Sequence, residues 1–188
     1  MAYLLDHRRC ALLVIDPQER LMAAIHKAER VSRNTALLVR AAKELSMPIL
    51  ATTQYVKGLG PFVPELAELL EDVETIDKME FNSFLNADFR RAAAALPASV
   101  DTLVITGVEA HICIYQTAVG AMSGAFGRAF ECWIAEDAVS SRQKRNWKSA
   151  IRLLGQQGAC CGPSELILYQ WLERAGTPVF KAMLPYLK

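Results

Sequence analysis

Short apolar runs rich in β-branched residues alternate with segments of helical periodicity along the whole chain. The sequence predicts strands at 11–16, 48–53, 74–77, 102–106 and 129–135, with a weaker one at 159–161. It predicts helices at 30–45, 87–95, 110–123 and 142–157, and a further helix that begins near Pro163. Such alternation implies crossover helices and a mostly parallel sheet.

Several of these strands, such as "ALLVI" and "TLVI", are apolar at nearly every position. This pattern is typical of strands that helices cover on both faces. The sequence therefore predicts a doubly wound, Rossmann-like α/β fold with a mostly parallel six-stranded sheet. A chain of 188 residues with 52% hydrophobic content suits one domain over residues 1–188.

Charge and hydropathy narrow the choice of partners. Lys and Arg number 21 against 20 Asp and Glu, a formal net charge of +1, which lacks the basic excess that nucleic-acid binding requires. No apolar run is long enough to span a bilayer, and the start of the chain does not resemble a signal peptide. We therefore expect a soluble cytoplasmic protein with a small-molecule substrate and neither nucleic acid nor membrane as a partner.

Cysteines and histidines limit the chemistry further. The five cysteines are an odd number at irregular spacing, which favours free thiols over a disulfide framework. The three histidines, His7, His26 and His111, show no metal-ligand spacing, so we expect no metal and no cofactor. Their scarcity also disfavours a Ser-His-Asp triad.

Three reactive side chains follow the predicted strands. Asp16 ends the first strand, Lys78 follows the third, and Cys113 lies shortly after the fourth. Ligands of doubly wound sheets bind beyond the carboxyl ends of the strands, so these three side chains are candidates for one site. A helix N-terminus and a nearby ammonium would favour the thiolate of Cys113.

Each of the three residues also has a plainer interpretation. Asp16, followed by a proline, suits a turn or a helix N-cap. Lys78 suits a solvated surface charge, and Cys113 suits a small buried hydrophobic residue. Their shared place at neighbouring strand ends favours the catalytic interpretation.

The residues around these three positions match known motifs. The Asp of "LLVIDPQ", the Lys of "IDKMEFNSF" and the Cys of "ITGVEAHICIYQTA" resemble the signatures of the isochorismatase-like cysteine hydrolases. Their order and spacing cover essentially the whole chain. The stretches "TTQYVKGLGPFVPEL" and "AEDAVSSRQKRNWKSAIRLL" resemble the metal-free isochorismatase-domain-containing subgroup.

The resemblance implies a role for each catalytic residue. Cys113 would be the nucleophile, Asp16 would accept the thiol proton and return it to the leaving group, and Lys78 would hold the pair by opposite charge. The resemblance further implies a cis peptide bond between Val108 and Glu109. The backbone N–H groups of Glu109 and Cys113 would then form an oxyanion hole.

The sequence also departs from parts of this family. Nicotinamidases carry a metal site of an Asp and histidines after the second strand, where this chain has "TTQYVKGLGPF" without a histidine. Isochorismatase itself cleaves a vinyl ether without a cysteine nucleophile, so Cys113 favours an amide, carbamoyl or related C–N substrate. Family members usually assemble as dimers or larger rings, so we expect a homo-oligomer.

Other residues near the strand ends are candidates for binding or closure. Substrate-pocket candidates, for which ordinary interhelical packing is the alternative, are Gln54, Tyr55, Phe81, Phe84 and Tyr115. The loop with Gly58, Gly60, Pro61 and Pro64 suits a segment that closes over a site or crosses to a neighbouring subunit.

Two further groups have a simple interpretation. His111, two residues before Cys113, would point away from it on a helix, so we interpret it as packing or pocket lining rather than a base. Cys160 and Cys161 suit core filling, with a redox role as the alternative.

The sequence lacks the motifs of two other functions. A nucleotide-binding module lacks both glycine-rich phosphate motifs, and a cysteine phosphatase would need an arginine where Val119 stands. A non-catalytic oligomeric member of the same fold, and an isochorismatase-type ether hydrolase, stay as alternatives to the cysteine hydrolase.

Overall fold

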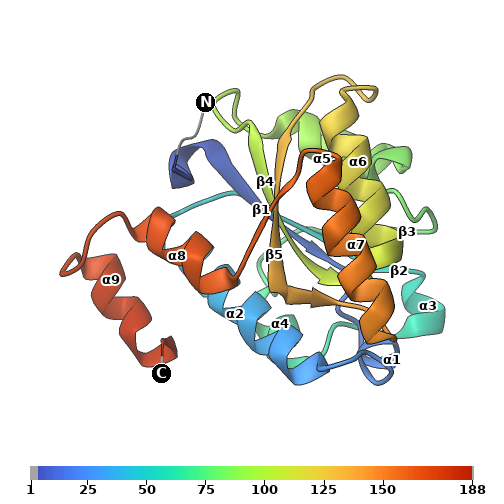
Figure 1. The fold of residues 1–188 in the computed structure, drawn as a ribbon, viewed down its shortest axis with the longest axis horizontal. Coiled ribbons are helices and arrows are strands. Elements are labelled where there is room, and N and C mark those ends of the chain that lie inside the picture. Colours follow the sequence, from blue (N-terminus) through green and yellow to red (C-terminus); the bar gives the residue numbers. More distant parts are fainter. Residues whose placement is uncertain (1–3, 188) are drawn as a thin grey trace.

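Six strands form one sheet in the order β3-β2-β1-β4-β5-β6, and the five strand pairings are parallel. The structure, a computed structural model, describes residues 4–187 (Figure 1). The strands are β1 (Cys10–Ile15), β2 (Ile49–Gln54), β3 (Thr75–Lys78), β4 (Thr102–Val108), β5 (Glu131–Ser140) and β6 (Cys160–Gly162). The predicted fold class is confirmed.

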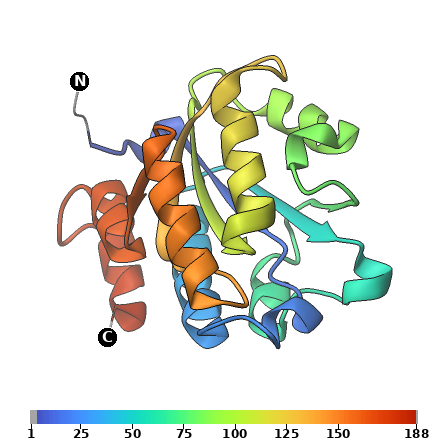
Figure 2. The ribbon, with the colours of Figure 1, turned by 45° about the vertical axis from the view of Figure 1, so that its right-hand side comes forward.

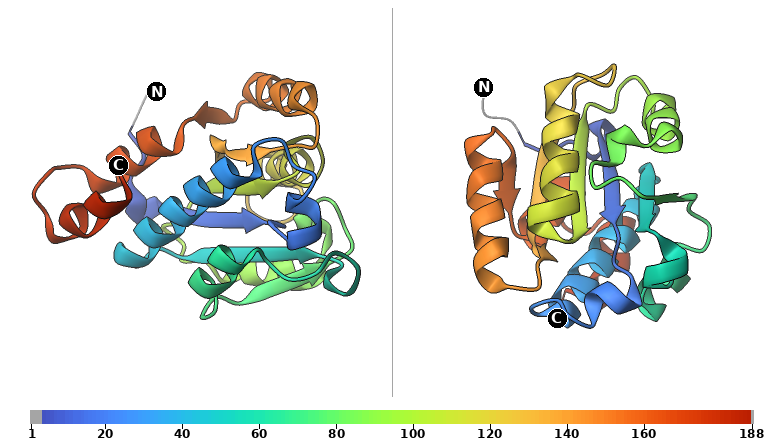
Figure 3. Two further views of the ribbon diagram at one scale, coloured as in Figure 1. Left: turned by 90° about the horizontal axis from the view of Figure 1, so that it is seen from below. Right: turned by 90° about the vertical axis from the view of Figure 1, so that its right-hand side faces the viewer.

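Helices cover both faces of the sheet, as the fully buried strands β1 and β4 require. On one face lie α2 (Ala28–Glu44), α4 (Pro64–Leu69), α8 (Ser164–Leu172) and α9 (Pro178–Met183). On the other face lie α5 (Ala87–Ala95), α6 (Tyr115–Ser123) and α7 (Lys144–Gln156). Figure 2 shows α6 and α7 side by side across the near face, and Figure 3 shows α9 at one extremity of the molecule.

Shorter turns complete the chain. They are α1 (Glu19–Met22), α3 (Val56–Leu59), the 3-10 turns η1 (His7–Arg9), η2 (Ser83–Leu85) and η4 (Leu184–Tyr186), and the π-helical turn η3 (Ala110–Ile114). The short helices α1, α3, α4 and α9 were not predicted, because four to six residues are too few to show a helical period. Among residues 4–187, no helix combines the length and apolar character needed to cross a bilayer.

Strand β5 is longer than the sequence predicts. It continues to Ser140, whereas the apolar run ends at Ala135. The charged residues Glu136 and Asp137 break the apolar pattern, but the strand continues because Val139 and Ser140 pair with the end of β4. Side chains of α2 also donate to main-chain carbonyls of this stretch. Arg30 Nη2 donates to the carbonyl of Val139 at 3.0 Å, for example. The predicted helix at 110–123 likewise differs at its start, where its first turn is the π-helical η3.

The strand order reverses between β1 and β4. The chain leaves β1 toward β2 and β3 on one side, and β4 is followed by β5 and β6 on the other. The ends of β1 and β4 therefore form the topological switch point, where open α/β sheets bind their ligands. The short helices α1 and α3 contact each other at this end of the sheet, at the lower right of Figure 1.

Candidate active site

Asp16 lies directly after β1 at the switch point. Its side chain is fully buried, and its backbone adopts the left-handed conformation with φ of 53°. The hydroxyl of Thr52, on the neighbouring strand β2, donates to Asp16 Oδ1 at 2.8 Å. The carboxylate is thus fixed by the sheet itself rather than by a loop.

Lys78 forms a buried ion pair with Asp16. It is the last residue of β3, two strands away from β1, and its side chain reaches past the end of β2. Nζ lies 2.7 Å from Asp16 Oδ2 and 2.8 Å from Gln54 Oε1. Both ion-pair partners are inaccessible to solvent, so the ammonium compensates a carboxylate that water does not reach.

Cys113 completes the group from the other side of the switch point. It lies in η3 with 6% of its surface exposed, more than Asp16 or Lys78. The charge of the Asp16 carboxylate acts on its thiol, since the two residues follow the paired strands β1 and β4. The structure thus brings together the three residues that the sequence singled out.

Burial governs the protonation of this group. It raises the pKa of the Cys113 thiol to about 12, and the charge of Asp16 raises it further, whereas the Lys78 ammonium and the Glu109 N–H oppose the rise. The expectation of a lowered thiol pKa is therefore wrong, because desolvation outweighs the ammonium. Burial also raises the pKa of Asp16, which makes this carboxylate a stronger base than an exposed one.

The peptide bond between Val108 and Glu109 is cis, at the position that the resemblance implies. Glu109 follows β4 directly, and its carbonyl accepts from the N–H groups of Ile112 at 3.0 Å and Ile114 at 3.2 Å. Glu109 thus begins the turn that carries the thiol. We call residues 109–113 the catalytic turn.

Two of the expected pocket residues lie at the end of β2. The Gln54 side chain accepts from Lys78 and donates to the Met79 carbonyl at 2.8 Å, so it supports the ion pair. Tyr55 is 47% exposed, and its ring lies so close to Gly58 that a Cβ there would stand 2.2 Å from it. The glycine-rich loop around it forms α3 and leads into α4.

The other three candidates differ in burial. Phe81 is half exposed, and Tyr115, the first residue of α6, is half-buried against the core. Phe84 is buried and packs against other phenylalanines, with ring centroids 5.0 Å from Phe89 and 6.0 Å from Phe126. The packing alternative therefore holds for Phe84.

Two supporting residues were missed in the sequence. Thr52 holds Asp16, and the buried side chain of Gln18 joins the loops after β1 and β2. Gln18 accepts from the Gln54 N–H at 2.7 Å and donates to the Gly60 carbonyl at 2.7 Å. The available signals were a threonine near the end of the second strand and a glutamine two residues after the catalytic acid.

The remaining cysteines are free thiols. Cys10 and Cys132 are buried in the core, Cys160 is exposed and Cys161 is half-buried. Core filling is thus wrong for Cys160, because the edge strand β6 leaves this side chain in solvent.

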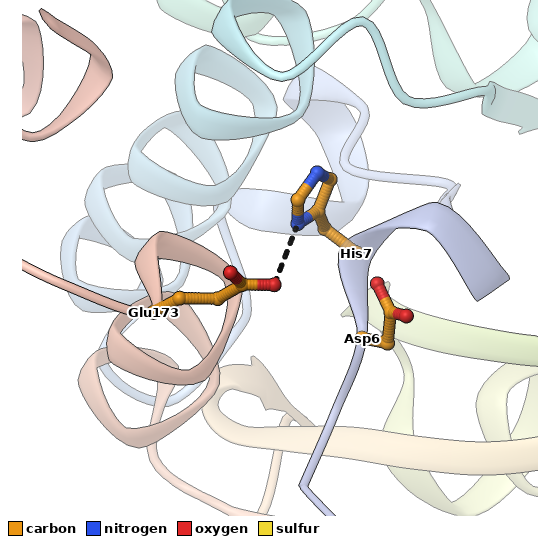
Figure 4. Close-up of side chains that lie close together, drawn as sticks. All are labelled: Asp6, His7 and Glu173. Carbon is orange, nitrogen blue, oxygen red and sulfur yellow. Dashed lines mark ion pairs between the residues drawn. The ribbon is translucent and has the colours of Figure 1, made fainter. Parts of the chain in front are cut away.

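Within residues 4–187, one group of possible metal ligands lies away from this site. Asp6, His7 and Glu173 bring ligand atoms within 4.8 Å of one another, and Figure 4 shows His7 turned toward Glu173. Arg8 already pairs with both carboxylates, at 2.7 Å from Asp6 and 2.8 Å from Glu173. The guanidinium holds the pKa of Asp6 below its usual range, so a resident cation already balances these charges.

The protein is thus a doubly wound α/β protein with Cys113, Asp16 and Lys78 at the switch point of its sheet. Residues 10–165 match the family described as the isochorismatase domain, and the chain belongs to this family. It has the fold of the family's hydrolases.

Comparison with known proteins agrees with this membership. The secreted isochorismatase effector Isc1 of Phytophthora sojae is 31% identical over 94% of this chain and 83% of its own length. Isochorismatase domain-containing protein 2 of Xenopus laevis is 32% identical over 94% of this chain and 82% of its own length.

Solved structures share the fold. MAR1 ribonuclease from Caenorhabditis elegans is 28% identical with a TM-score of 0.87, over 98% of this chain and 92% of that one. The YcaC gene product from Escherichia coli, an octameric hydrolase of unknown specificity, is 24% identical with a TM-score of 0.87. That match covers 99% of this chain and 94% of the other.

Proposed function

We propose that this protein is a cysteine hydrolase that cleaves a small amide, carbamoyl or related C–N substrate through Cys113, Asp16 and Lys78. The observation that carries the proposal is the buried ion pair of Asp16 and Lys78, 2.7 Å apart, at the strand ends beside Cys113, where the carboxylate charge raises the pKa of the thiol. A thiol beside a base, with the base held by a third group, is the arrangement of an activated nucleophile.

The reaction begins from a neutral thiol. As the sulfur attacks the carbonyl carbon, the thiol proton passes to Asp16 and the carbonyl oxygen becomes an oxyanion. The N–H groups of Glu109 and Cys113 are the proposed donors to that oxygen. The proton then passes from Asp16 to the leaving nitrogen, so the C–N bond breaks and an amine leaves a thioester on Cys113.

Hydrolysis of the thioester closes the cycle. The oxygen of a water molecule attacks the acyl carbon while Asp16 accepts a proton from that water. Asp16 then returns this proton to the departing sulfur. The products are a carboxylic acid and an amine, and the thiol is restored. Lys78 keeps its charge throughout and stabilises Asp16 whenever the carboxylate is ionised.

Acylation by p-nitrophenyl acetate tests this proposal, with the acetyl adduct located by peptide mass spectrometry. Burial raises the pKa of Cys10 and Cys132 to about 12, as it does for Cys113, so these two thiols are matched internal controls for acidity. We expect acetylation of Cys113 well ahead of both. Equal labelling of the three would overturn the proposal.

A screen of small amides with the wild type and Cys113→Ala separates the alternatives. Loss of hydrolysis in Cys113→Ala supports the cysteine hydrolase. An ether hydrolase that needs no thiol would keep its activity in this variant, and a non-catalytic member would acetylate Cys113 no faster than the exposed Cys160.

RNA is a rival substrate, because the C. elegans relative is named a ribonuclease. We propose a small molecule instead, since the net charge of +1 gives no excess of cations for a polyanion. Cleavage of RNA that weakens with salt and is abolished in Cys113→Ala would contradict this choice.

We further propose a homo-oligomer in the cytoplasm. The E. coli relative is octameric, and the side chains of Met79, Phe81 and Leu85 are more than half exposed beside the site. Free thiols suit a reducing compartment. Light scattering on the purified protein and cell fractionation are the corresponding measurements.

A further inference from the structure

The catalytic turn is tied to the segment that joins β5 to α7, and Glu109 makes the first tie. The Glu109 side chain is buried, and its Oε2 accepts from the backbone N–H of Arg142 at 2.8 Å. Its Oε1 pairs with Arg142 Nε at 3.0 Å. A carboxylate that accepts a main-chain N–H and a guanidinium together is held in one orientation.

His111 makes the second tie. Its Nδ1 lies 2.9 Å from Ser141 Oγ, and its Nε2 lies 3.4 Å from the amide nitrogen of Asn146. Ser141 and Asn146 lie on either side of the point where α7 begins. The imidazole is therefore a bridge between the catalytic turn and the start of α7.

These ties act on a residue with a main-chain role. The carbonyl of Glu109 accepts from the N–H groups of Ile112 and Ile114, which flank Cys113 in the chain. The side chain and the carbonyl of Glu109 are thus both engaged, so loss of the carboxylate contacts removes an anchor of the turn that carries the thiol. Misplacement of a reacting group by about 1 Å costs about 10²-fold in rate in other enzymes.

We propose that Glu109 and His111 are positioning residues, which form a clamp that holds the catalytic turn against Ser141, Arg142 and Asn146 and so positions Cys113 beside Asp16. The inference rests on the proposed function, because it concerns the same nucleophile. The two side chains contact no reacting atom and act through the main chain.

Asp137 provides a matched control for the clamp. Its carboxylate also accepts a main-chain N–H, that of Ser164 at 2.7 Å, together with the Ser164 hydroxyl. This contact fixes the start of α8, on the face opposite α6 and α7. Asp137→Leu therefore removes the same kind of interaction without touching the catalytic turn.

The test measures the rate of Cys113 acetylation by p-nitrophenyl acetate against reagent concentration and pH. In Glu109→Leu we expect the maximal rate to fall about 10²-fold with the half-saturating concentration nearly unchanged. Glu109→Gln keeps an acceptor for the Arg142 N–H and should recover most of this rate. In Glu109→Leu the pH at which the rate falls in acid should stay that of the wild type, because Asp16 keeps its contacts with Thr52 and Lys78.

A purely structural role would give another pattern. Asp137→Leu should lower the melting temperature and leave both the rate and the pH profile of Cys113 unchanged. Wild-type acetylation in Glu109→Leu would overturn the clamp and leave the proposed function intact. Failure of the wild-type protein to acetylate Cys113 would instead overturn the proposed function.

Ser141→Ala keeps the test decisive if Glu109→Leu does not fold. It removes only the hydroxyl that lies within hydrogen-bond distance of His111 Nδ1, at 2.9 Å. We expect acetylation about tenfold slower, the effect of one lost hydrogen bond on alignment. An unchanged rate in folded Ser141→Ala would overturn the part of the clamp assigned to His111.

Discussion

Gly107 and Ile15 face each other in the β1–β4 ladder so closely that a Cβ at Gly107 would stand 1.9 Å from the carbonyl oxygen of Ile15. Gly107 also has φ of 109°, a conformation that side chains disfavour. Because Asp16 follows Ile15 and the catalytic turn follows Val108, this contact sets how closely the acid and the thiol approach. Glycine at this position therefore belongs to the site as much as to the fold.

Gly107→Ala should consequently damage both stability and chemistry. Overpacking costs about 1–3 kcal/mol, and the unfavourable φ adds about 1–3 kcal/mol. We expect the free energy of unfolding, measured with urea, to fall by at least about 2 kcal/mol, and Cys113 acetylation to slow in the folded fraction.

Gly155→Ala is the matched control. Gly155 lies in α7, is exposed, and a Cβ there would meet nothing within 4 Å. Alanine should stabilise this helix by up to about 1 kcal/mol and leave acetylation unchanged. A Gly107→Ala variant as stable and as reactive as Gly155→Ala would show that the close approach is dispensable.

The sequence predicted the architecture because the relevant information is local. Each buried strand is an apolar run, so β1, β4 and the order of elements follow from hydropathy alone. The three reactive residues were found for the same reason, since strand ends in a parallel sheet converge.

The sequence did not predict what depends on contacts between distant residues. The extension of β5 past Glu136 comes from its pairing with the end of β4, and the place of Phe84 comes from three other phenylalanines. The direction of the Cys113 pKa shift depends on how much water the whole fold excludes. Local patterns carry no measure of that burial.

The ion pair of Asp16 and Lys78 predicts strong coupling between the two positions. Asp16→Asn leaves an ammonium in a site with no solvent, and Lys78→Met leaves a carboxylate there. Breaking a buried pair in this way costs about 3–5 kcal/mol. We expect the double variant to unfold with a smaller loss than the sum of the single variants, because it contains no buried charge.

Urea unfolding of the wild type, the two single variants and the double variant measures this coupling. None of the three variants should hydrolyse or acetylate at the wild-type rate, although the double variant regains stability. Additive losses of stability would mean that the two charges do not compensate each other.

The role of Asp16 as base predicts a particular pH dependence. Acetylation requires the ionised carboxylate, so the wild-type rate should fall as the pH drops through the pKa of Asp16, which burial places above the ordinary aspartate range. At pH values above the pKa of Asp16 the rate should be nearly independent of pH, because Asp16 rather than hydroxide takes the thiol proton.

Asp16→Asn should lose the plateau. Without the carboxylate, attack depends on the thiolate, whose fraction rises about tenfold per pH unit below the thiol pKa. Stopped-flow acetylation between pH 5 and 10 distinguishes the two profiles; these limits are roughly the range in which the protein should stay folded. A wild-type rate with the same tenfold slope would assign the proton transfer to hydroxide.

Gln54 supplies the last prediction, because its Oε1 is the second acceptor of the buried Lys78 ammonium, at 2.8 Å. Gln54→Leu removes this acceptor and should lower the free energy of unfolding by about 1.5–3 kcal/mol, the range for hydrogen bonds to charged groups. It should also slow acetylation less than Asp16→Asn, since Lys78 keeps its contact with the carboxylate. Gln170→Leu is the control. The Gln170 side chain accepts from the Leu5 N–H at 2.9 Å and donates to the Leu166 carbonyl at 3.1 Å, and both partners are neutral. Its loss should cost about 0.5–1.5 kcal/mol for each hydrogen bond and leave acetylation unchanged. Equal effects of the two substitutions on stability and rate would remove Gln54 from the support of the ion pair and return it to the substrate-pocket candidates.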